Sequence, residues 1–326
     1  MSQVPAPQTT KAQVLWLTVL RWFDSWAGID TMKVVGPPKM DWIRCFPLIA
    51  VHVMCLGIIW VGWSWIAVAV ATAFYFVRMF AITGWYHRYF SHRTFKTSRA
   101  CQFAFAVLGG SCAQRGPLWW AGHHRHHHIA SDTSDDVHSP LHGGFLWSHM
   151  GWFTSQTHFA PRLKNIADFA KFPELRFLDR FDILVPTIAG FGMFGLGMLL
   201  ETYAPDLGTN GSQMLIWGFF VSTVALVHGT CTINSLSHVY GSQRYKTGDT
   251  SRNNFFLALI TMGEGWHNNH HYYPASTRQG FYWWEVDMTY YCLKMMEMVG
   301  LVWDIKDVPS YVREGKASRT PSRYNV

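Results

Sequence analysis

The chain contains four long apolar runs. A helix needs roughly 20 apolar residues to cross the hydrocarbon layer of a bilayer, and all four runs approach that length. They are Phe46 to Gly62, Ile66 to Trp85, Ile183 to Leu200 and Met214 to Ile233. A Trp-rich turn joins the first two and residues 201–212 join the second two. We therefore expect two transmembrane hairpins, with aromatic residues at the membrane interface.

Lys and Arg are distributed unevenly around these runs. Neither hairpin connection contains one, whereas the segment from Tyr86 to Phe181 and the tail after Ser237 are rich in both. By the positive-inside rule, both termini and the central segment face the cytoplasm. This placement accounts for the formal net charge of +7 without nucleic acid as a partner. We expect a multi-pass protein of the lipid bilayer, most simply in a bacterial inner membrane.

The predicted fold is all-α and integral to the membrane, with four transmembrane helices and a cytoplasmic helical cap, in one domain over residues 1–326. Its parts are an N-terminal cytoplasmic arm (1–45), a transmembrane hairpin (46–85), a cytoplasmic cap (86–181), a second hairpin (182–235), and further cap with a tail (236–326). The stretch from Val14 to Trp26 is weakly amphipathic and is expected either in the interface plane or as a short soluble helix. Met1 to Thr10 lacks a secretory signal pattern, so the mature chain is expected to begin there.

Some polar residues inside the apolar runs have ordinary structural interpretations. His52 and His228 stand alone in their runs and are interpreted as hydrogen-bonded core residues. Arg78 is interpreted as snorkelling to the interface or as one half of an ion pair between helices. The six cysteines show no C-x-x-C spacing and are interpreted as small buried hydrophobes.

Most of the 17 histidines fall into three compact groups: HRYFSH, GHHRHHH and HNNHH. The spacing H-x-x-H-H occurs in the second and third groups, and on a helix it is expected to deliver three imidazoles to one place. His87 and His92 are five residues apart, about 140° around an α-helix axis, and would suit two different metal ions better than one. His87 follows the second run, while Asn234 and His238 close the fourth. All groups are therefore expected on the same side of the membrane.

One H-x-x-x-x-H pair, two H-x-x-H-H triplets and His238 supply nine imidazoles. This number is too large for one metal ion and suits a pair. Imidazole also binds zinc, copper and nickel, so ligand type does not fix the metal. A centre at the ends of transmembrane helices, without an obvious hydrolytic nucleophile, favours oxidation of an apolar substrate by iron and O₂, because zinc does not change its oxidation state. Candidate acceptors for the far ring nitrogens of ligand imidazoles are Asp132, Asp135, Asp136 and Glu264, which could equally be solvated acidic residues.

The three histidine boxes, H-x-x-x-x-H, H-x-x-H-H and H-x-x-H-H, resemble those of membrane fatty acyl desaturases, the group that includes stearoyl-CoA and bacterial acyl desaturases. The likeness runs from Trp85 to Pro274 through HRYFSHR, HRHHHIASDTSDDVHSP, SHMGW, NSLSH and GEGWHNNHHYYP. It implies two iron ions that use O₂ to remove two hydrogens from adjacent methylenes and leave a cis double bond, with the delta-9 position expected. The implied iron ligands are His87, His92, His124, His127, His128, His238, His267, His270 and His271, with Asn234 binding through a water.

The second box has two possible registers, because His123, His126 and His127 also satisfy H-x-x-H-H. The resemblance favours His124, since Arg125 follows it as in the family. It then puts His123 where acyl-CoA enzymes commonly have Asp, and Gly122 where they have a basic residue. Both acyl-CoA and acyl-lipid substrates therefore stay open.

The resemblance also implies where the acyl chain lies and how electrons arrive. Gln114 and Trp120 match tunnel-lining positions, and Ala71 and Tyr75 match its closed end, although aromatics on apolar helices are usually packing residues. The chain contains no fused cytochrome-like domain or C-x-x-C cluster. We therefore expect a separate electron carrier of the ferredoxin, rubredoxin or cytochrome b5 type, docking on the basic cytoplasmic face.

Two other classes of membrane protein could also carry many histidines. A membrane hydroxylase or ketolase would use similar histidine boxes, but the N-S-x-x-H element and GEGWHNNHH favour the desaturase. A non-enzymatic metal-binding protein, such as a transporter or sensor, should line a path across the bilayer with its histidines instead of gathering them on one face.

Overall fold

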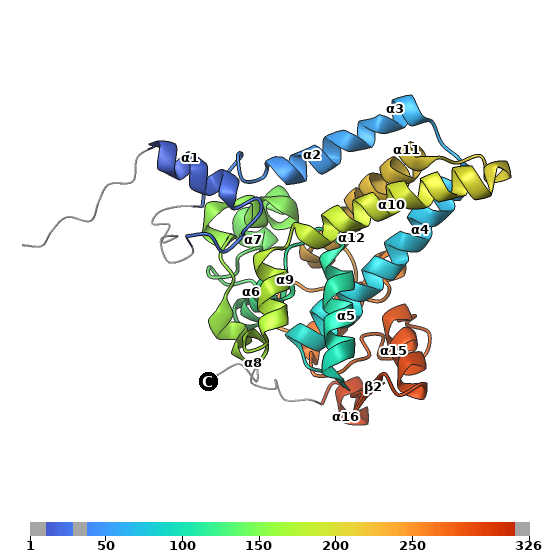
Figure 1. Cartoon of the computed structure of the whole chain (residues 1–326). Helices are drawn as coiled ribbons and strands as arrows, with labels where there is room; N and C mark the ends of the chain where they lie inside the picture. Colours follow the sequence, from blue (N-terminus) through green and yellow to red (C-terminus); the bar gives the residue numbers. More distant parts are fainter. Residues whose placement is uncertain (1–10, 29–37, 317–326) are drawn as a thin grey trace, which may run out of the picture.

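The computed structural model describes residues 11–28 and 38–316. The expectation for Met1 to Thr10, and part of those for the N-terminal arm and the tail, lie outside this range. Within it the regular structure is mostly helical, as predicted (Figure 1). A short antiparallel pair departs from the all-α expectation: β1 (Lys96–Thr97) pairs with β2 (Val302–Trp303). This pair ties the segment after the first histidine box to the segment near the end of the chain.

Three helices are long and apolar enough to cross a membrane: Trp65–Ser91, Leu184–Tyr203 and Gly211–His238. The sequence predicts four. The first run instead forms a shorter apolar helix, Phe46–Val61, in which a 3-10 turn, η2 (Cys55–Gly57), separates α2 (Phe46–Met54) from α3 (Ile58–Val61). At about 1.5 Å per residue it is roughly 24 Å long, less than the hydrocarbon thickness of about 30 Å. Gly62, with φ of +64°, ends it in a conformation that favours glycine.

Two of the three long helices, the first and the third, change their winding along their length. The first is α4 (Trp65–Phe80) continued by a π-helical segment, η3 (Ala81–Ser91), and the second is α10 (Leu184–Tyr203). The third consists of α11 (Gly211–Gln213), π-helical η9 (Met214–Val221), α12 (Ser222–Asn234) and a 3-10 turn, η10 (Leu236–His238). Helix α4 packs against η9 and α12, while α10 packs against η9.

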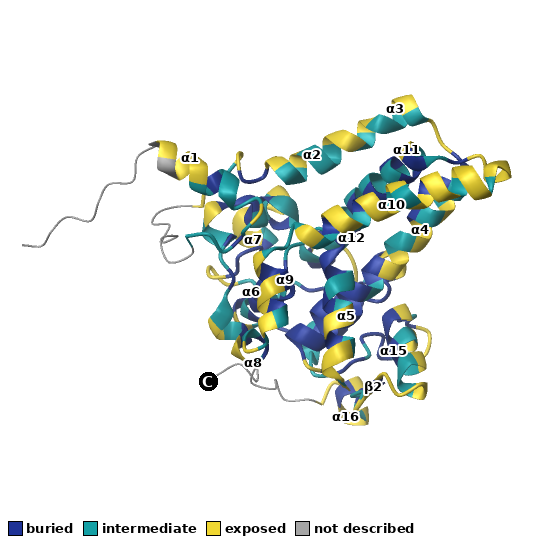
Figure 2. Ribbon diagram, in the orientation of Figure 1, coloured by how far each residue is buried: buried dark blue, intermediate teal, exposed yellow. Residues whose placement is uncertain are grey.

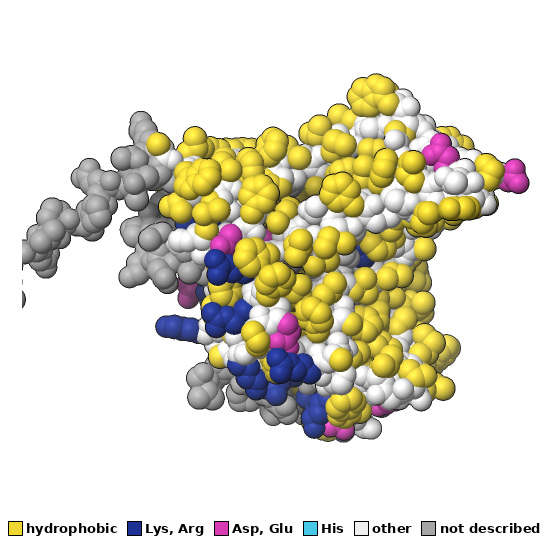
Figure 3. Space-filling view, in the orientation of Figure 1, with side chains coloured by type: hydrophobic (Ala, Val, Ile, Leu, Met, Phe, Trp, Pro, Cys, Tyr) yellow, Lys and Arg dark blue, Asp and Glu magenta, His cyan; other side chains and the backbone are white. Residues whose placement is uncertain are grey.

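The surface of this helical half is apolar. Large side chains such as Ile59, Trp60, Trp65 and Phe191 are each at least 74% exposed. Exposed residues alternate with partly buried ones along α2, α3 and α10 (Figure 2), and hydrophobic side chains cover this region, whereas the visible Lys and Arg gather near α8 and α9 (Figure 3). Contiguous apolar surface of this extent indicates contact with lipid.

The other half of the molecule is built from shorter helices that surround the histidine boxes. The remaining helical elements of the described chain, in chain order, are α1 (Lys11–Leu20), α5 (Arg99–Gly110), α6 (Pro117–Ala130), α7 (Pro140–Gly143), η4 (Trp147–Gly151), η5 (Trp152–Thr154), η6 (Gln156–His158), η7 (Leu163–Ile166), α8 (Ala167–Ala170), α9 (Pro173–Arg180), η8 (Pro205–Leu207), α13 (Phe255–Ile260), α14 (His267–Tyr272), α15 (Met288–Met298) and α16 (Ser310–Arg313). Of these, η8 lies in the connection between α10 and α11. Trp85 of η3 is fully buried and stacks on Phe105 of α5 at 4.1 Å between ring centroids. This stacking anchors the C-terminal end of the Trp65–Ser91 helix in the half of the molecule that contains the histidine boxes.

Candidate metal centre

One group of five histidines, called cluster 1 here, brings ring nitrogens from η3, the residue after it, α6 and α14 within 4.8 Å of one another. Its members are His87, His92, His124, His128 and His270. Their Nε2 atoms form a row of short contacts: His87 to His270 3.1 Å, His270 to His128 3.0 Å, His128 to His124 3.0 Å, and His124 to His92 3.0 Å.

The expectation that His87 and His92 suit different ions is wrong in geometry, because both belong to cluster 1. It assumed α-helical winding, which separates residues five apart. Here the segment is π-helical, with hydrogen bonds from residue i+5 to residue i. The His92 N–H accordingly donates to the His87 carbonyl at 3.2 Å. The two side chains therefore lie one above the other.

Four more histidines form cluster 2, again with ring nitrogens within 4.8 Å. They are His127, His238, His267 and His271. The Nε2 atoms of His238 and His267 lie 3.1 Å apart. Those of His127 and His271 are buried without a hydrogen-bond partner in the described part of the chain. Their lone pairs are thus available to a ligand.

Each H-x-x-H-H box divides between the two clusters, which corrects the expectation that it delivers three imidazoles to one place. In both boxes the i, i+4 pair goes to one cluster and the residue at i+3 goes to the other. Residues four apart on an α-helix differ by about 40° around the axis, whereas i+3 and i+4 differ by about 100°. The boxes therefore bridge two neighbouring sites.

The nitrogen spacing fits bound metal ions. Imidazole nitrogens bind first-row metals at about 2.1 Å, so two ligands at right angles have nitrogens about 3.0 Å apart. The contacts in cluster 1 match this value. Four successive contacts between Nε2 atoms cannot all be hydrogen bonds among neutral imidazoles, because each Nε2 carries either one proton or one lone pair and three of these atoms take part in two contacts each. A shared cation satisfies every one of these nitrogens.

Carboxylates hold the far nitrogens of several cluster histidines. Glu264 contacts His87 Nδ1 at 2.5 Å, Asp136 contacts His127 Nδ1 at 3.0 Å, and Asp132 lies 3.6 Å from His238 Nδ1. All three were sequence candidates, whereas the side chain of the fourth, Asp135, is exposed. Sequence reasoning missed Asp249, which lies 2.8 Å from His271 Nδ1. It sits in a loop outside every box, so no spacing relates it to its histidine.

Electrostatics favour neutral imidazoles at five of the nine positions in these clusters. Burial first, and the neighbouring histidines second, hold the pKa well below its usual value at four positions of cluster 1 and at one of cluster 2. They are His92, His124, His128, His270 and His267. Burial alone would raise the pKa of Asp249 and Asp136, but the contacts with His271 and His127 lower both pKa values below the ordinary range. Neutral imidazoles oriented by carboxylates are the form that binds metal.

The remaining sequence candidates occupy different surroundings. His123 and His126, the alternative register of the second box, lie outside both clusters, with Nε2 contacts to the carbonyls of Ala160 and Asp135. Asn234 ends α12, and its carbonyl accepts a hydrogen bond from Ser148 at 2.6 Å.

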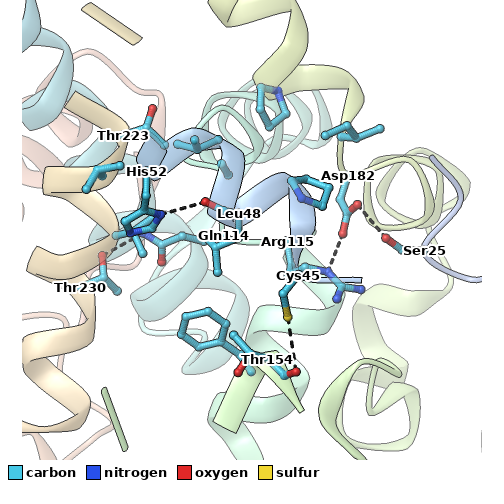
Figure 4. A pocket seen from close by; sticks show the side chains of 18 of the residues that line it. Ser25, Cys45, Leu48, His52, Gln114, Arg115, Thr154, Asp182, Thr223 and Thr230 are labelled. Atoms are coloured by element: carbon cyan, nitrogen blue, oxygen red, sulfur yellow. Dashed lines mark hydrogen bonds and ion pairs between the residues drawn. The ribbon is translucent and has the colours of Figure 1, made fainter. Parts of the chain in front are cut away.

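A cavity of about 690 Å³ reaches cluster 1 at His124. Figure 4 shows some of the side chains that line it. Its walls come from α2, α10 and the third span, and His124 and Asn234 are among its lining residues. Two of the predicted tunnel residues also line it: Gln114, which donates to Thr230 Oγ1 at 3.0 Å, and Trp120, which stacks on His124. A mostly apolar cavity that reaches a candidate metal site suits a hydrocarbon chain.

The other two predicted tunnel residues do not line this cavity. Ala71 is buried in α4, and the Tyr75 hydroxyl donates to the Ile260 carbonyl at 2.8 Å. That they mark the closed end of an acyl tunnel therefore stays a prediction from the resemblance.

His52 and His228 meet across α2 and α12, with Nε2 atoms 3.2 Å apart. His228 also contacts His149, which reaches Ser235 at 2.9 Å. Their interpretation as hydrogen-bonded core residues therefore agrees with the structure. Arg78, by contrast, neither snorkels nor forms an ion pair in the described part of the chain; it is fully buried and donates to Ser222, Thr223 and Ser111.

Comparison with known proteins is consistent with this site. Residues 63–303 match the family model described as fatty acid desaturase. An acyl-CoA 5-desaturase of Anemone leveillei is 37% identical over 293 residues, covering 86% of each chain. An sn-1 stearoyl-lipid 9-desaturase of Anabaena variabilis is 35% identical over 281 residues, covering 85% of this chain and 97% of the relative. The delta-9 acyl-lipid desaturase 1 of Arabidopsis thaliana is 35% identical over 271 residues, covering 82% and 84%.

The matched region contains all three histidine boxes and both clusters, so the similarity includes the part of the chain that carries the chemistry. Histidine clusters that could hold metal and helices long enough to cross a membrane are both consistent with enzymes of lipid metabolism. The chain belongs to the fatty acid desaturase family, whose members are oxidoreductases that act on acyl chains.

Proposed function

We propose that this desaturase introduces a cis double bond at the delta-9 position of a saturated acyl chain, using two iron ions held by clusters 1 and 2. The observation that carries the proposal is the pair of neighbouring imidazole clusters, of which cluster 1 reaches a mostly apolar cavity through His124. Iron is proposed because removal of hydrogen from an unactivated chain is an oxidation, and zinc does not change its oxidation state. Relatives named as 9-desaturases support the double-bond position.

The irons would supply the oxidising chemistry with O₂. The protein would hold two adjacent methylenes against cluster 1, which converts an encounter in solution into a positioned reaction. Trp120, which lines the cavity and stacks on His124, fits this positioning role. The apolar walls from α2 and α10 would exclude bulk water from the reacting carbons. Overall, two hydrogens from the chain, two electrons and two protons reduce O₂ to two waters.

The test has two parts. Metal analysis of the purified protein should find two irons per chain. Expression in a host without desaturase activity, followed by gas chromatography and mass spectrometry of its fatty acids, should find new cis-9 monounsaturated chains. Hydroxylated or keto products would instead assign the chain to the other oxidative reactions of such sites, and a protein that binds no iron would overturn the proposal.

We also propose that the electron carrier docks where the surface opens onto cluster 1. A second cavity, of about 600 Å³, is lined by His92, by five Lys or Arg residues and by two aspartates, Asp168 and Asp304, so positive charge is in excess. An acidic carrier would be steered to such a surface, and its association would weaken with salt. The class of carrier, whether ferredoxin, rubredoxin or cytochrome b5, is tested by which one supports turnover with the purified enzyme.

The proposed location is a bacterial inner membrane, with both termini and the clusters in the cytoplasm and one desaturase domain over the whole chain. The distribution of Lys and Arg supports this orientation, because neither connection between the paired apolar runs contains one. Reporter fusions at residue 206 and at the C-terminus should report opposite sides of the membrane. The same side for both would contradict the arrangement.

A further inference from the structure

Three arginines line one region of the large cavity: Arg21, Arg44 and Arg115. Arg44 is only 7% exposed, and its Nη1 has no hydrogen-bond partner among the described residues. Its Nη2 donates to the Ser25 carbonyl at 3.3 Å, and its guanidinium lies over the Phe159 ring at 4.1 Å. A buried guanidinium with a free donor beside a cavity is an unfilled hydrogen-bonding site for a ligand.

The nearby carboxylates already have other partners. Asp182 lines the cavity and accepts from Arg115 Nε at 2.6 Å and from Ser25 Oγ at 2.7 Å (Figure 4). The side chain of Asp41 accepts the backbone N–H of Arg44 at 3.0 Å. Arg21 donates to the carbonyls of Ala27 and Gly28. Among the described residues, Asp182 is the only acidic one that lines the cavity, so the three guanidinium groups of the cavity outnumber its carboxylates.

This excess of positive charge has an energetic consequence. Burial, then Arg115 and Arg21, lower the pKa of Arg44 to about 9, against the weaker effects of Asp182 and Asp41. A buried charge is costly unless a partner of opposite sign compensates it. An anionic ligand would supply that partner.

The arginines lie where a membrane lipid carries its headgroup. Arg44 stands two residues before α2 begins, and Asp182 two residues before α10 begins, so the site is at the polar ends of two apolar helices. Trp16, Phe23 and Trp42 in the adjoining segments are each at least 60% exposed, as expected of an aromatic interface belt. From here the cavity continues between α2 and α10 and reaches His124.

We propose that Arg44, with Arg21 and Arg115, binds the phosphate of a glycerophospholipid whose acyl chain occupies the cavity. The inference rests on the proposed function and names its substrate class. A phosphodiester of this kind lies a few atoms from the acyl ester, so it can reach the arginines while its chain stays in the cavity. The phosphates of acyl-CoA are held away from the acyl group by the pantetheine arm, which makes them the less suitable occupant.

Binding, which needs no turnover, tests this inference separately from the desaturase reaction. Native mass spectrometry of the purified full-length protein would measure its affinity for distearoylphosphatidylglycerol, for the uncharged distearoyl galactolipid and for stearoyl-CoA. We expect the phospholipid to bind about tenfold more tightly than the galactolipid, a ratio within the range of one charge-assisted hydrogen bond. Arg44→Gln should reduce this preference to about twofold.

Arg313→Gln, an exposed arginine on α16, is the matched control and should keep the full preference. If Arg44→Gln does not fold, Arg21→Gln provides a second, less buried variant, and a partial loss is expected. An unchanged preference in both variants would overturn the inference, and so would stearoyl-CoA binding more tightly than the phospholipid. A protein that binds phospholipid in this way but yields no desaturated product would refute only the proposed function.

Discussion

At the scale of single residues, the clusters depend on which nitrogen of each imidazole points inward. In cluster 2 the far nitrogens of His127 and His271 contact Asp136 and Asp249, and their Nε2 atoms are left to face the site. A neutral imidazole has one donor and one acceptor nitrogen, so a carboxylate that binds the donor fixes the acceptor. Each carboxylate therefore decides which nitrogen of its histidine keeps the lone pair that can bind a metal ion.

The register of the second histidine box gives one prediction. His128→Ala should abolish desaturation and remove iron, because His128 contacts both His124 and His270 within cluster 1. His123→Ala should retain much of the activity, since His123 lies outside both clusters. Fatty acid analysis in the expression host and metal analysis of the purified variants check both outcomes. The reverse result would refute the assignment of the second box.

Asp249 gives a second prediction. Asp249→Asn should weaken iron binding about 10- to 100-fold, as removal of a carboxylate behind a metal-bound imidazole typically does. Dissociation of iron measured against a chelator would report this change. Asp135→Asn is the matched control, because this aspartate is exposed and its side chain holds no cluster imidazole. Equal affinities in the two variants would mean that Asp249 does not orient His271.

At the scale of helices, winding and capping bring distant boxes together. Arg88 of η3 is 1% exposed and donates to both carboxylate oxygens of Asp287 at 2.9 and 3.0 Å. Asp287 is also the N-cap of α15 and accepts the Tyr290 N–H at 3.0 Å. Glu264, which contacts His87, accepts from the same arginine at 3.1 Å. One buried guanidinium thus connects the first span, the third box and α15.

Loss of this connection should be costly. Asp287→Asn should lower the free energy of unfolding by about 3 to 5 kcal/mol, because it leaves the Arg88 charge buried with one carboxylate partner fewer. Asp304→Asn breaks a pair with Lys96 in which both side chains are more than half exposed, and should change stability by less than about 1 kcal/mol. Unfolding in mixed detergent micelles would compare the two. Similar effects would show that the buried pair contributes no more than the exposed one.

At the scale of the whole molecule, burying many imidazoles makes stability depend on pH. The pKa values of His92, His124 and His128 are lowered in the folded protein, so the unfolded chain takes up their protons first as the pH falls. The metal-free protein should therefore lose stability as the pH falls below about 6.5, the ordinary histidine value. The lowered pKa values of Asp136 and Asp249 add a second loss below about pH 4.

Thermal unfolding of metal-free and iron-loaded protein between pH 8 and 5 would measure this dependence. Iron should raise stability most near neutral pH, because its ligands must be deprotonated. A flat profile for the metal-free protein over this range would contradict the predicted linkage.

The sequence by itself determined the helical class, the histidine boxes and the family. Each depends on local information, because run length, helical period and motif spacing are readable along the chain. The candidate carboxylates Asp136 and Glu264 were also found in this way, because they lie within ten residues of a histidine box.

Only the tertiary structure decided how the boxes are shared. The π-helical winding of η3 set His87 beside His92, and each H-x-x-H-H box split between two clusters because its partners lie on other helices. Packing likewise placed Asp249 behind His271 and left Nη1 of Arg44 without a hydrogen-bond partner among the described residues. These features depend on contacts between segments far apart in sequence, and no local pattern encodes which side chain fills the space opposite another.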